Sequence, residues 1–181
     1  MATEQHFNNA EGFVTAKWVG SKGDTIEIEG RHNTTTYSSA DAVALAYAGD
    51  SSMVPDRIVF LHGTDTLCRL GSPTRATTWE DIERACVESD GSLSYDETMF
   101  SFAPTVDSSS DKFYEFNRVT FHGRTQNIPD GNRIYMACLT GNKRNGDGKV
   151  LLAIVDLANE GVYRQKPHDF ELSIDWAVKF K

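Results

Sequence analysis

Histidine, cysteine and carboxylate side chains are the residues of this chain that could bind a metal ion or transfer protons. The five histidines include no pair at the spacing that places two imidazoles on one face of a strand or helix. They are His6, His32, His62, His122 and His168. The three cysteines form no CxxC pair and are Cys68, Cys86 and Cys138. We predict no metal site and no cofactor, and expect reduced thiols in a protein made in the cytosol, with one disulfide as the alternative.

Residues 62–66, His-Gly-Thr-Asp-Thr, form a denser cluster directly after the apolar segment 57–61 (RIVFL). This stretch resembles the second threonine motif of type I/II L-asparaginases, which also follows a buried strand. The resemblance implies catalytic roles for Thr64 and Asp65. The other threonine motif of that family, TGGTI, has no counterpart here, since the nearest stretch, residues 20–26, reads GSKGDTI. We therefore predict that the cluster is a strand-to-loop turn.

Other catalytic patterns are missing from the chain. It contains no GxSxG, no Walker A sequence and no GxGxxG. The acidic pair Glu80 and Asp81 precedes an apolar helical pattern, where negative charge complements the helix dipole. We predict that the chain is not an enzyme, and we assign no catalytic residue.

The charge balance disfavours a nucleic-acid partner. Eighteen basic residues face 26 acidic residues, a formal net charge of −8, whereas a phosphate-binding surface needs a basic stripe. The densest basic segment is Lys143, Arg144 and Lys149, in a Gly/Asn/Asp turn that we predict to be a solvated hairpin tip. Residues 1–10 lack the apolar stretch of a signal peptide, and no apolar run approaches the ~20 residues of a membrane span.

Hydrophobic periodicity predicts strands over most of the chain. We expect them at residues 12–19, 25–29, 57–61, 98–104, 114–125, 134–139, 150–157 and 170–180. The clearest is the last, in which every second residue is large and apolar, so that one face of a sheet receives all six. These six are Phe170, Leu172, Ile174, Trp176, Val178 and Phe180.

Two short helices interrupt the strands. The first follows Ser38 and Ser39, which are suited to N-capping, and ends at Gly49. Its predicted inner face is formed by Val43, Ala46 and Tyr47. The second helix begins after a capping signature at residues 78–81 and ends at residues 89–91, and its predicted inner face is Trp79, Ile82 and Cys86.

These elements predict a mainly β fold with two short helices. We expect an antiparallel β-sandwich of jelly-roll type, formed by a single domain over residues 12–181. Residues 1–11 carry no core pattern and are predicted to form an N-terminal arm.

The order of sequence blocks resembles that of tailed-bacteriophage virion structural proteins, of the capsid decoration or tail-fibre amino-terminal type. The matching blocks are residues 42–48, 55–66 (PDRIVFLHGTDT), 118–123 (RVTFHG), 148–157 (GKVLLAIVDL) and 170–180 (FELSIDWAVKF). An E-I-G-L-(F/Y) block of those proteins is replaced by residues 134–139 (IYMACL). The resemblance implies a virion protein, made in the host cytoplasm, that binds major capsid or tail proteins and forms a homo-oligomer. Its implied role is a decoration (cement), collar or fibre-base component.

The alternative class is a non-viral β-sandwich that binds carbohydrate or protein. Aromatic rings could stack on sugars at Trp18, Trp79, Tyr95 and Tyr114. In either class we expect contacts through segments between strands, because a rigid sheet frame leaves recognition to its connections. The candidate contact segments are residues 1–11, 62–77 and 158–167.

Overall fold

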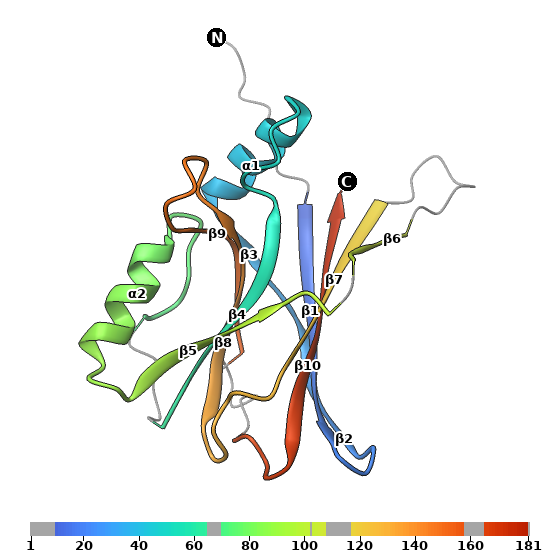
Figure 1. Cartoon of the computed structure of the whole chain (residues 1–181), viewed down its shortest axis with the longest axis vertical. Coiled ribbons are helices and arrows are strands. Elements are labelled where there is room, and N and C mark those ends of the chain that lie inside the picture. The colour runs from blue at the N-terminus through green and yellow to red at the C-terminus, as the bar shows by residue number, and fades with distance from the viewer. Residues whose placement is uncertain (1–9, 65–69, 102, 108–116, 158–164, 181) are drawn as a thin grey trace.

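Two antiparallel sheets packed face to face form the frame of the computed structural model (Figure 1). The structure describes residues 10–64, 70–101, 103–107, 117–157 and 165–180. The described strands are β1 (Ala10–Gly20), β2 (Thr25–His32), β3 (Thr34–Thr35), β4 (Pro55–Gly63), β5 (Leu93–Met99), β6 (Thr105–Asp107), β7 (Asn117–Thr125), β8 (Arg133–Asn142), β9 (Lys149–Asp156) and β10 (Phe170–Phe180). The described helices are α1 (Tyr37–Tyr47) and α2 (Trp79–Glu88).

The strand order of the first sheet is β2-β1-β10-β7-β6, and that of the second is β3-β9-β8-β4-β5. The sheets are joined where β2 continues into β3 and where the chain after β5 bridges to β7 through Phe100 and Gly123. Four consecutive segments of the chain therefore have the spatial order of a Greek key. The last of them, β8, lies beside the first, β4, which is followed by the β5–β6 segment and then by β7. The mainly β fold and its two antiparallel sheets confirm the prediction, whereas this strand order does not establish a jelly roll.

The core between the sheets is anchored by β10, as its alternation predicts. Leu172, Ile174 and Trp176 are almost fully buried, and Trp176 faces Val14 of β1 and Phe121 of β7 in the strand register. β4 is buried on both faces, because Ile58 and Phe60 join this core while Val59 and Leu61 pack beneath α2. Neither described helix is long and apolar enough to cross a membrane.

α2 packs on the outer face of the second sheet, and α1 lies at the upper end of this sheet, where it packs on Leu152 of β9 (Figure 1). α2 begins as predicted: the Thr78 hydroxyl accepts from the backbone N–H of Asp81, and the Asp81 carboxylate accepts from the N–H of Thr78. Its inner face contains Trp79, Ile82 and Ala85. Burial of this face secures α2 over β5 and β9.

The start of α1 differs from the prediction. Thr36 is the N-terminal flanking residue, so Ser38 and Ser39 lie inside the first turn instead of capping it. The Thr36 hydroxyl points toward the carbonyls of Leu151 and Leu152 on β9, to which it donates, and it makes no capping hydrogen bond to the helix. The predicted end is confirmed, because Gly49 has a φ of 81° and closes the last turn through its N–H bond to Ala46.

Strand positions also differ from the prediction, among them those of β1, β5 and β6. β1 begins at Ala10, so the last two residues of the predicted arm pair with β10, while residues 1–9 lie outside the described residues. β5 begins at Leu93, five residues before the predicted strand, and β6 lies in a predicted loop. The sequence of β5, LSYDETM, hides its strand character because its carboxylates have partners on other strands. Glu97 pairs with Arg57 and Lys149, and Asp96 accepts from the Thr125 hydroxyl.

Candidate functional site

The His-Gly-Thr-Asp-Thr cluster lies at the end of β4, where this strand pairs with β5. Gly63 is buried against the 92–93 backbone, and the Thr64 N–H donates to the carbonyl of Ser92 at 3.1 Å. The Thr64 side chain is exposed, and Asp65 and Thr66 lie outside the described residues. The described part of the cluster, residues 62–64, thus ends the pairing between β4 and β5.

His62 is the buried polar residue of this cluster, with 5% of its surface exposed. Its Nδ1 lies 3.0 Å from Nδ2 of Asn132, which donates to it from the turn before β8. Burial lowers the pKa of His62 below its ordinary value of 6.5, and the nearby Asp96 carboxylate opposes this effect only in part. Burial therefore favours the neutral form of His62 in the folded protein, and its hydrogen bond to Asn132 links β4 to the 129–132 turn.

This lowered pKa makes stability depend on pH. As the pH falls below 6.5, unfolded His62 takes up a proton that folded His62 resists, so the free energy of unfolding decreases. A single proton contributes a slope of at most about 1.4 kcal/mol per pH unit. We expect His62→Gln to flatten this decrease, measured by urea denaturation between about pH 5 and about pH 8.

His168 provides the matched control with the opposite sign. Its hydrogen bond to Asp130 raises the pKa of this imidazole, so the stability it contributes is complete below 6.5 and is lost as the pH rises through the raised value. His168→Gln should therefore lower stability mainly at acid pH. Parallel pH profiles for the wild type and His62→Gln would show that His62 is not the titrating group.

A second polar cluster fastens the segment before β10 to the same turn. Asp130 accepts from His168 Nδ1 at 2.6 Å and pairs with Lys166, whose side chain is only 7% exposed. The Lys166 backbone also bonds to Gly131 and Asn132, at 3.0 and 2.8 Å. The described end of the predicted 158–167 contact segment is therefore tied to the domain.

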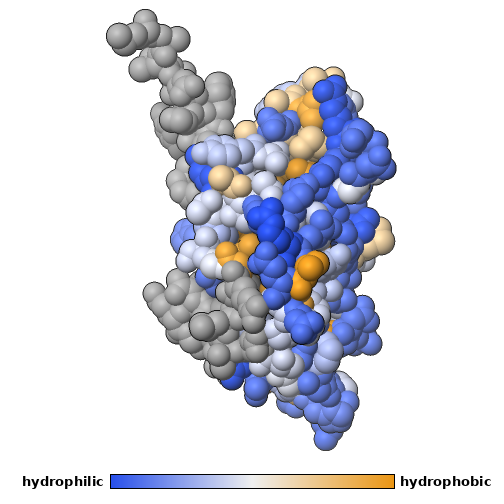
Figure 2. All heavy atoms as spheres, turned by 90° about the vertical axis from the view of Figure 1, so that its left-hand side faces the viewer, coloured by the Kyte–Doolittle hydropathy of each residue, from blue (hydrophilic) through white to orange (hydrophobic). Residues whose placement is uncertain are grey.

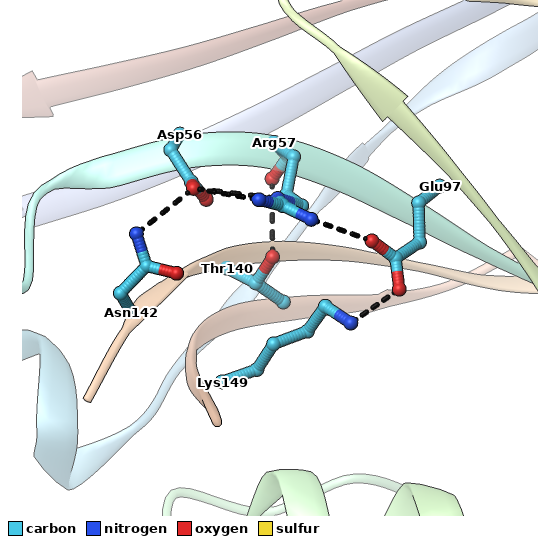
Figure 3. Close-up of polar contacts among 6 residues, drawn as sticks. All are labelled: Asp56, Arg57, Glu97, Thr140, Asn142 and Lys149. Atoms are coloured by element: carbon cyan, nitrogen blue, oxygen red, sulfur yellow. Dashed lines mark hydrogen bonds and ion pairs between the residues drawn. The ribbon is translucent and has the colours of Figure 1, made fainter. Parts of the chain in front are cut away.

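The most extended polar network crosses the outer face of the second sheet (Figure 3). Asn142 Nδ2 donates to Asp56 at 3.1 Å, Arg57 pairs with Asp56 at 3.2 Å and with Glu97 at 2.8 Å, and Lys149 also pairs with Glu97. Burial would raise the pKa of Glu97, but the hydrogen bonds from Lys149 and Arg57 outweigh it and lower this pKa. The network connects β4, β5, β8 and β9 with charges that compensate one another.

The four aromatic residues considered for sugar binding do not share one surface. Trp18 is fully buried between the sheets, Trp79 is 3% exposed, and Tyr114 lies outside the described residues. Trp79 and Tyr95 do meet edge to face, with ring centroids 5.4 Å apart, but Lys149 Nζ lies 5.0 Å from the Trp79 centroid. Trp18 and Trp79 are therefore core residues that cannot stack on a sugar.

The basic hairpin between β8 and β9 is fixed to both helical regions. Lys143 pairs with Glu80 of α2 at 2.5 Å, and Arg144 pairs with Asp50, which follows α1, at 3.2 Å. Lys149 belongs to the network of Figure 3. The predicted hairpin tip is present and exposed around Arg144, and its cations also have carboxylate partners; Lys149 instead begins β9 and is only 19% exposed.

A polar ladder crosses the first sheet. Asp175 Oδ1 lies 2.6 Å from His122 Nδ1, and His122 Nε2 lies 3.3 Å from the Thr105 hydroxyl. These residues come from β10, β7 and β6, which are neighbours in the sheet. The order of groups is that of a nucleophilic triad, but Asp175 and Thr105 are exposed to solvent on the sheet surface, and we interpret the ladder as a cross-strand tie.

α1 presents apolar side chains to solvent. Tyr47 is 91% exposed, Tyr37 61% and Val43 41%. The buried side of the helix is Ala42 with Leu45, so the predicted inner face of Val43, Ala46 and Tyr47 in fact points outward. Figure 2 shows apolar residues gathered at the top of the helix-bearing side, where α1 lies. Tyr37, Ala40, Val43, Ala44 and Tyr47 are together called the α1 stripe below.

Comparison with known proteins adds no relative. No family model matches the chain, and neither a curated protein nor a solved structure matches it significantly. The α1 stripe and the polar clusters must therefore be interpreted from their own geometry.

Sequence reasoning missed the α1 stripe for a physical reason. α1 contains one charged residue, Asp41, and is apolar or small on every side, so no polar face marks its exposed surface. The available signal was this very lack of a charged face in an 11-residue surface helix. The networks were missed because their members are far apart in sequence, as with His122 and Asp175.

Proposed function

We propose that this protein is a structural component of a tailed-phage virion and works by docking to other virion subunits. In this role it is a decoration (cement), collar or fibre-base protein of the capsid or tail. The observation that carries the docking function is the exposed α1 stripe. The block resemblance in the sequence supports the choice of a virion as the assembly.

An exposed apolar helix surface is unfavourable in an isolated protein. Monomeric proteins rarely expose contiguous apolar patches, and a helix that is apolar all round is normally covered. Val54, 41% exposed, adds to the apolar surface of this region. Covering such side chains with a partner contributes roughly 25 cal/mol per Å² of apolar surface removed from water.

The α1 stripe is held rigidly, as a docking surface requires. Ala42 and Leu45 of α1 pack with Met53 and with Leu152 of β9. The helix ends in a Schellman arrangement, in which Asp50 N–H donates to Leu45 at 2.9 Å and Gly49 N–H donates to Ala46 at 3.0 Å. Little conformational entropy is then lost in α1 when a partner binds.

The first test asks whether the chain is present in purified virions and whether the α1 stripe holds it there. Tyr47→Lys should lower occupancy on stripped particles at least about tenfold, because losing an interface aromatic that a partner covers costs about 2 kcal/mol or more. Occupancy is measured by quantitative mass spectrometry after re-binding of purified protein.

Val87→Lys is the matched control, since Val87 lies on α2 and is 80% exposed. It introduces the same charge on the other helix and should leave occupancy unchanged. Equal loss for both variants would point to a general charge effect and remove α1 from the mechanism. Absence of the wild-type chain from virions would overturn the virion assignment.

A further inference from the structure

We propose that the α1 stripe binds a second copy of this chain, with the two α1 helices packed antiparallel about a two-fold axis. The inference rests on the proposed docking function and names the partner of that surface. Three properties of the stripe support it: its spacing, its symmetry and its lack of charge.

The spacing of the stripe is that of a helix-pairing seam. Tyr37, Ala40, Ala44 and Tyr47 follow one another at intervals of three, four and three residues, which places them along one side of a helix. Ala42 and Leu45, on the other side, attach the helix to the domain. Ala40, Ala44 and Tyr47 can therefore face another molecule while α1 keeps its own packing, whereas at the start of the seam Arg75 lies over the Tyr37 ring, 5.2 Å from its centroid.

The order of residues along the seam is the same in both directions. In an antiparallel pair centred on Ala42, Tyr37 of one copy faces Tyr47 of the other, and Ala40 faces Ala44. A two-fold contact requires this kind of self-complementarity, because each copy contributes the same patch. The alanines allow the helix axes to approach to about 8 Å, while the tyrosines close the two ends.

Electrostatics favour this surface for contact between identical chains. Each copy carries a formal charge of −8, so most pairs of like surfaces repel. The five stripe residues have no formal charge. Asp41, the one charged residue of α1, lies outside the seam on the flank away from Val43, and the two-fold axis places the Asp41 residues of the two copies on the same flank, beside the contact. The opposed helix dipoles also attract.

The size of the contact sets the expected strength. An 11-residue helix is about 16 Å long, and a single helix pair buries less than the roughly 1,200 Å² of a standard stable interface. The isolated dimer is therefore weak. In an assembly, the same contact gains strength because neighbouring copies are already held close together.

Disulfide trapping tests the arrangement in purified protein, without particles. Ala40→Cys and Ala44→Cys chains are mixed and oxidised, and the mixture should give several-fold more cross-linked dimer than either variant alone. Wild-type chain gives the background from the native cysteines, and Val87→Cys on α2 is the exposed control. Circular dichroism of each variant verifies folding.

A second measurement is sedimentation equilibrium at rising concentration. The wild type should approach the dimer mass, and Ala44→Glu should remain monomeric with an unchanged melting temperature. Predominant self-linking of Ala44→Cys, or no linking above background, would overturn the antiparallel pair. If pairing fails while Tyr47→Lys still loses virion occupancy, α1 docks on a different subunit. If pairing succeeds while virions lack the chain, only the virion assignment fails.

Discussion

Replacing Trp176 by alanine is expected to lower the free energy of unfolding by about 3–5 kcal/mol. The indole is fully buried in the middle of β10, the central strand of the first sheet. Its strand neighbours Val14 and Phe121 pack in the same core, so the lost volume cannot be filled without moving two other strands. A loss of this size is a large share of the stability of a typical domain.

Trp176→Phe separates packing from hydrogen bonding. The indole N–H is buried and has no hydrogen-bond acceptor among the described residues, so removing it sacrifices no bond and relieves a desolvated donor. Trp176→Phe should thus cost clearly less than Trp176→Ala. Urea denaturation of the variants gives the difference.

Ser173→Ala is the control on the same strand. Ser173 lies on the opposite, outward face of β10 and is half-buried, so its replacement should change stability by no more than about 0.5 kcal/mol. If Trp176→Ala unfolds at the same denaturant concentration as Ser173→Ala, the alternation of β10 does not define the core.

The fold was predictable from the sequence wherever burial of one face of an element produces a regular spacing of apolar residues. β10 alternates, and Leu172, Ile174 and Trp176 of its apolar face are buried while Phe170 and Val178 are half-buried; the Phe180 side chain lies outside the description. β4 is a short continuous apolar run and is buried from Ile58 to Leu61. The capping signature of α2 was equally informative, since it is local chemistry. The start of β5 was predicted too far along the chain, because Asp96 and Glu97 look like loop residues until their partners on other strands are known.

The candidate surfaces were less predictable than the frame that carries them. Two sets of α1 residues fit a helical period: the predicted inner face of Val43, Ala46 and Tyr47, and the actual inner residues Ala42 and Leu45. Because α1 has no polar side, its sequence does not show which of the two sets is buried. The network of Asp56, Arg57, Glu97 and Lys149 depends on strand order, which a sequence alone does not give. The charged residues of this network connect strands through ion pairs, although in the sequence they look like ordinary surface residues.

Gly63→Ala is expected to destabilise the protein strongly, by about 3 kcal/mol or more, the upper end of the cost of overpacking. A Cβ atom at this position would lie 1.9 Å from the backbone carbonyl oxygen of Ser92. Real Cβ atoms do not approach an oxygen so closely, and the obstacle is backbone, so a side-chain rotation cannot relieve the clash. The β4–β5 pair would have to separate at its end, where Gly63 faces Leu93.

This expectation distinguishes the two interpretations of the His-Gly-Thr-Asp-Thr cluster. If the cluster is structural, Gly63→Ala lowers the urea midpoint markedly, while Thr64→Ala, at an exposed side chain, leaves it nearly unchanged. If the cluster is catalytic, in the manner of the asparaginases that it resembles, Thr64→Ala should instead abolish ammonia release from asparagine. Measuring both variants for stability and for ammonia release settles the choice, because wild-type ammonia release that Thr64→Ala removes would contradict the structural role. We expect no such activity in the wild type, since the packing of Gly63 against Ser92 accounts for the glycine by geometry alone.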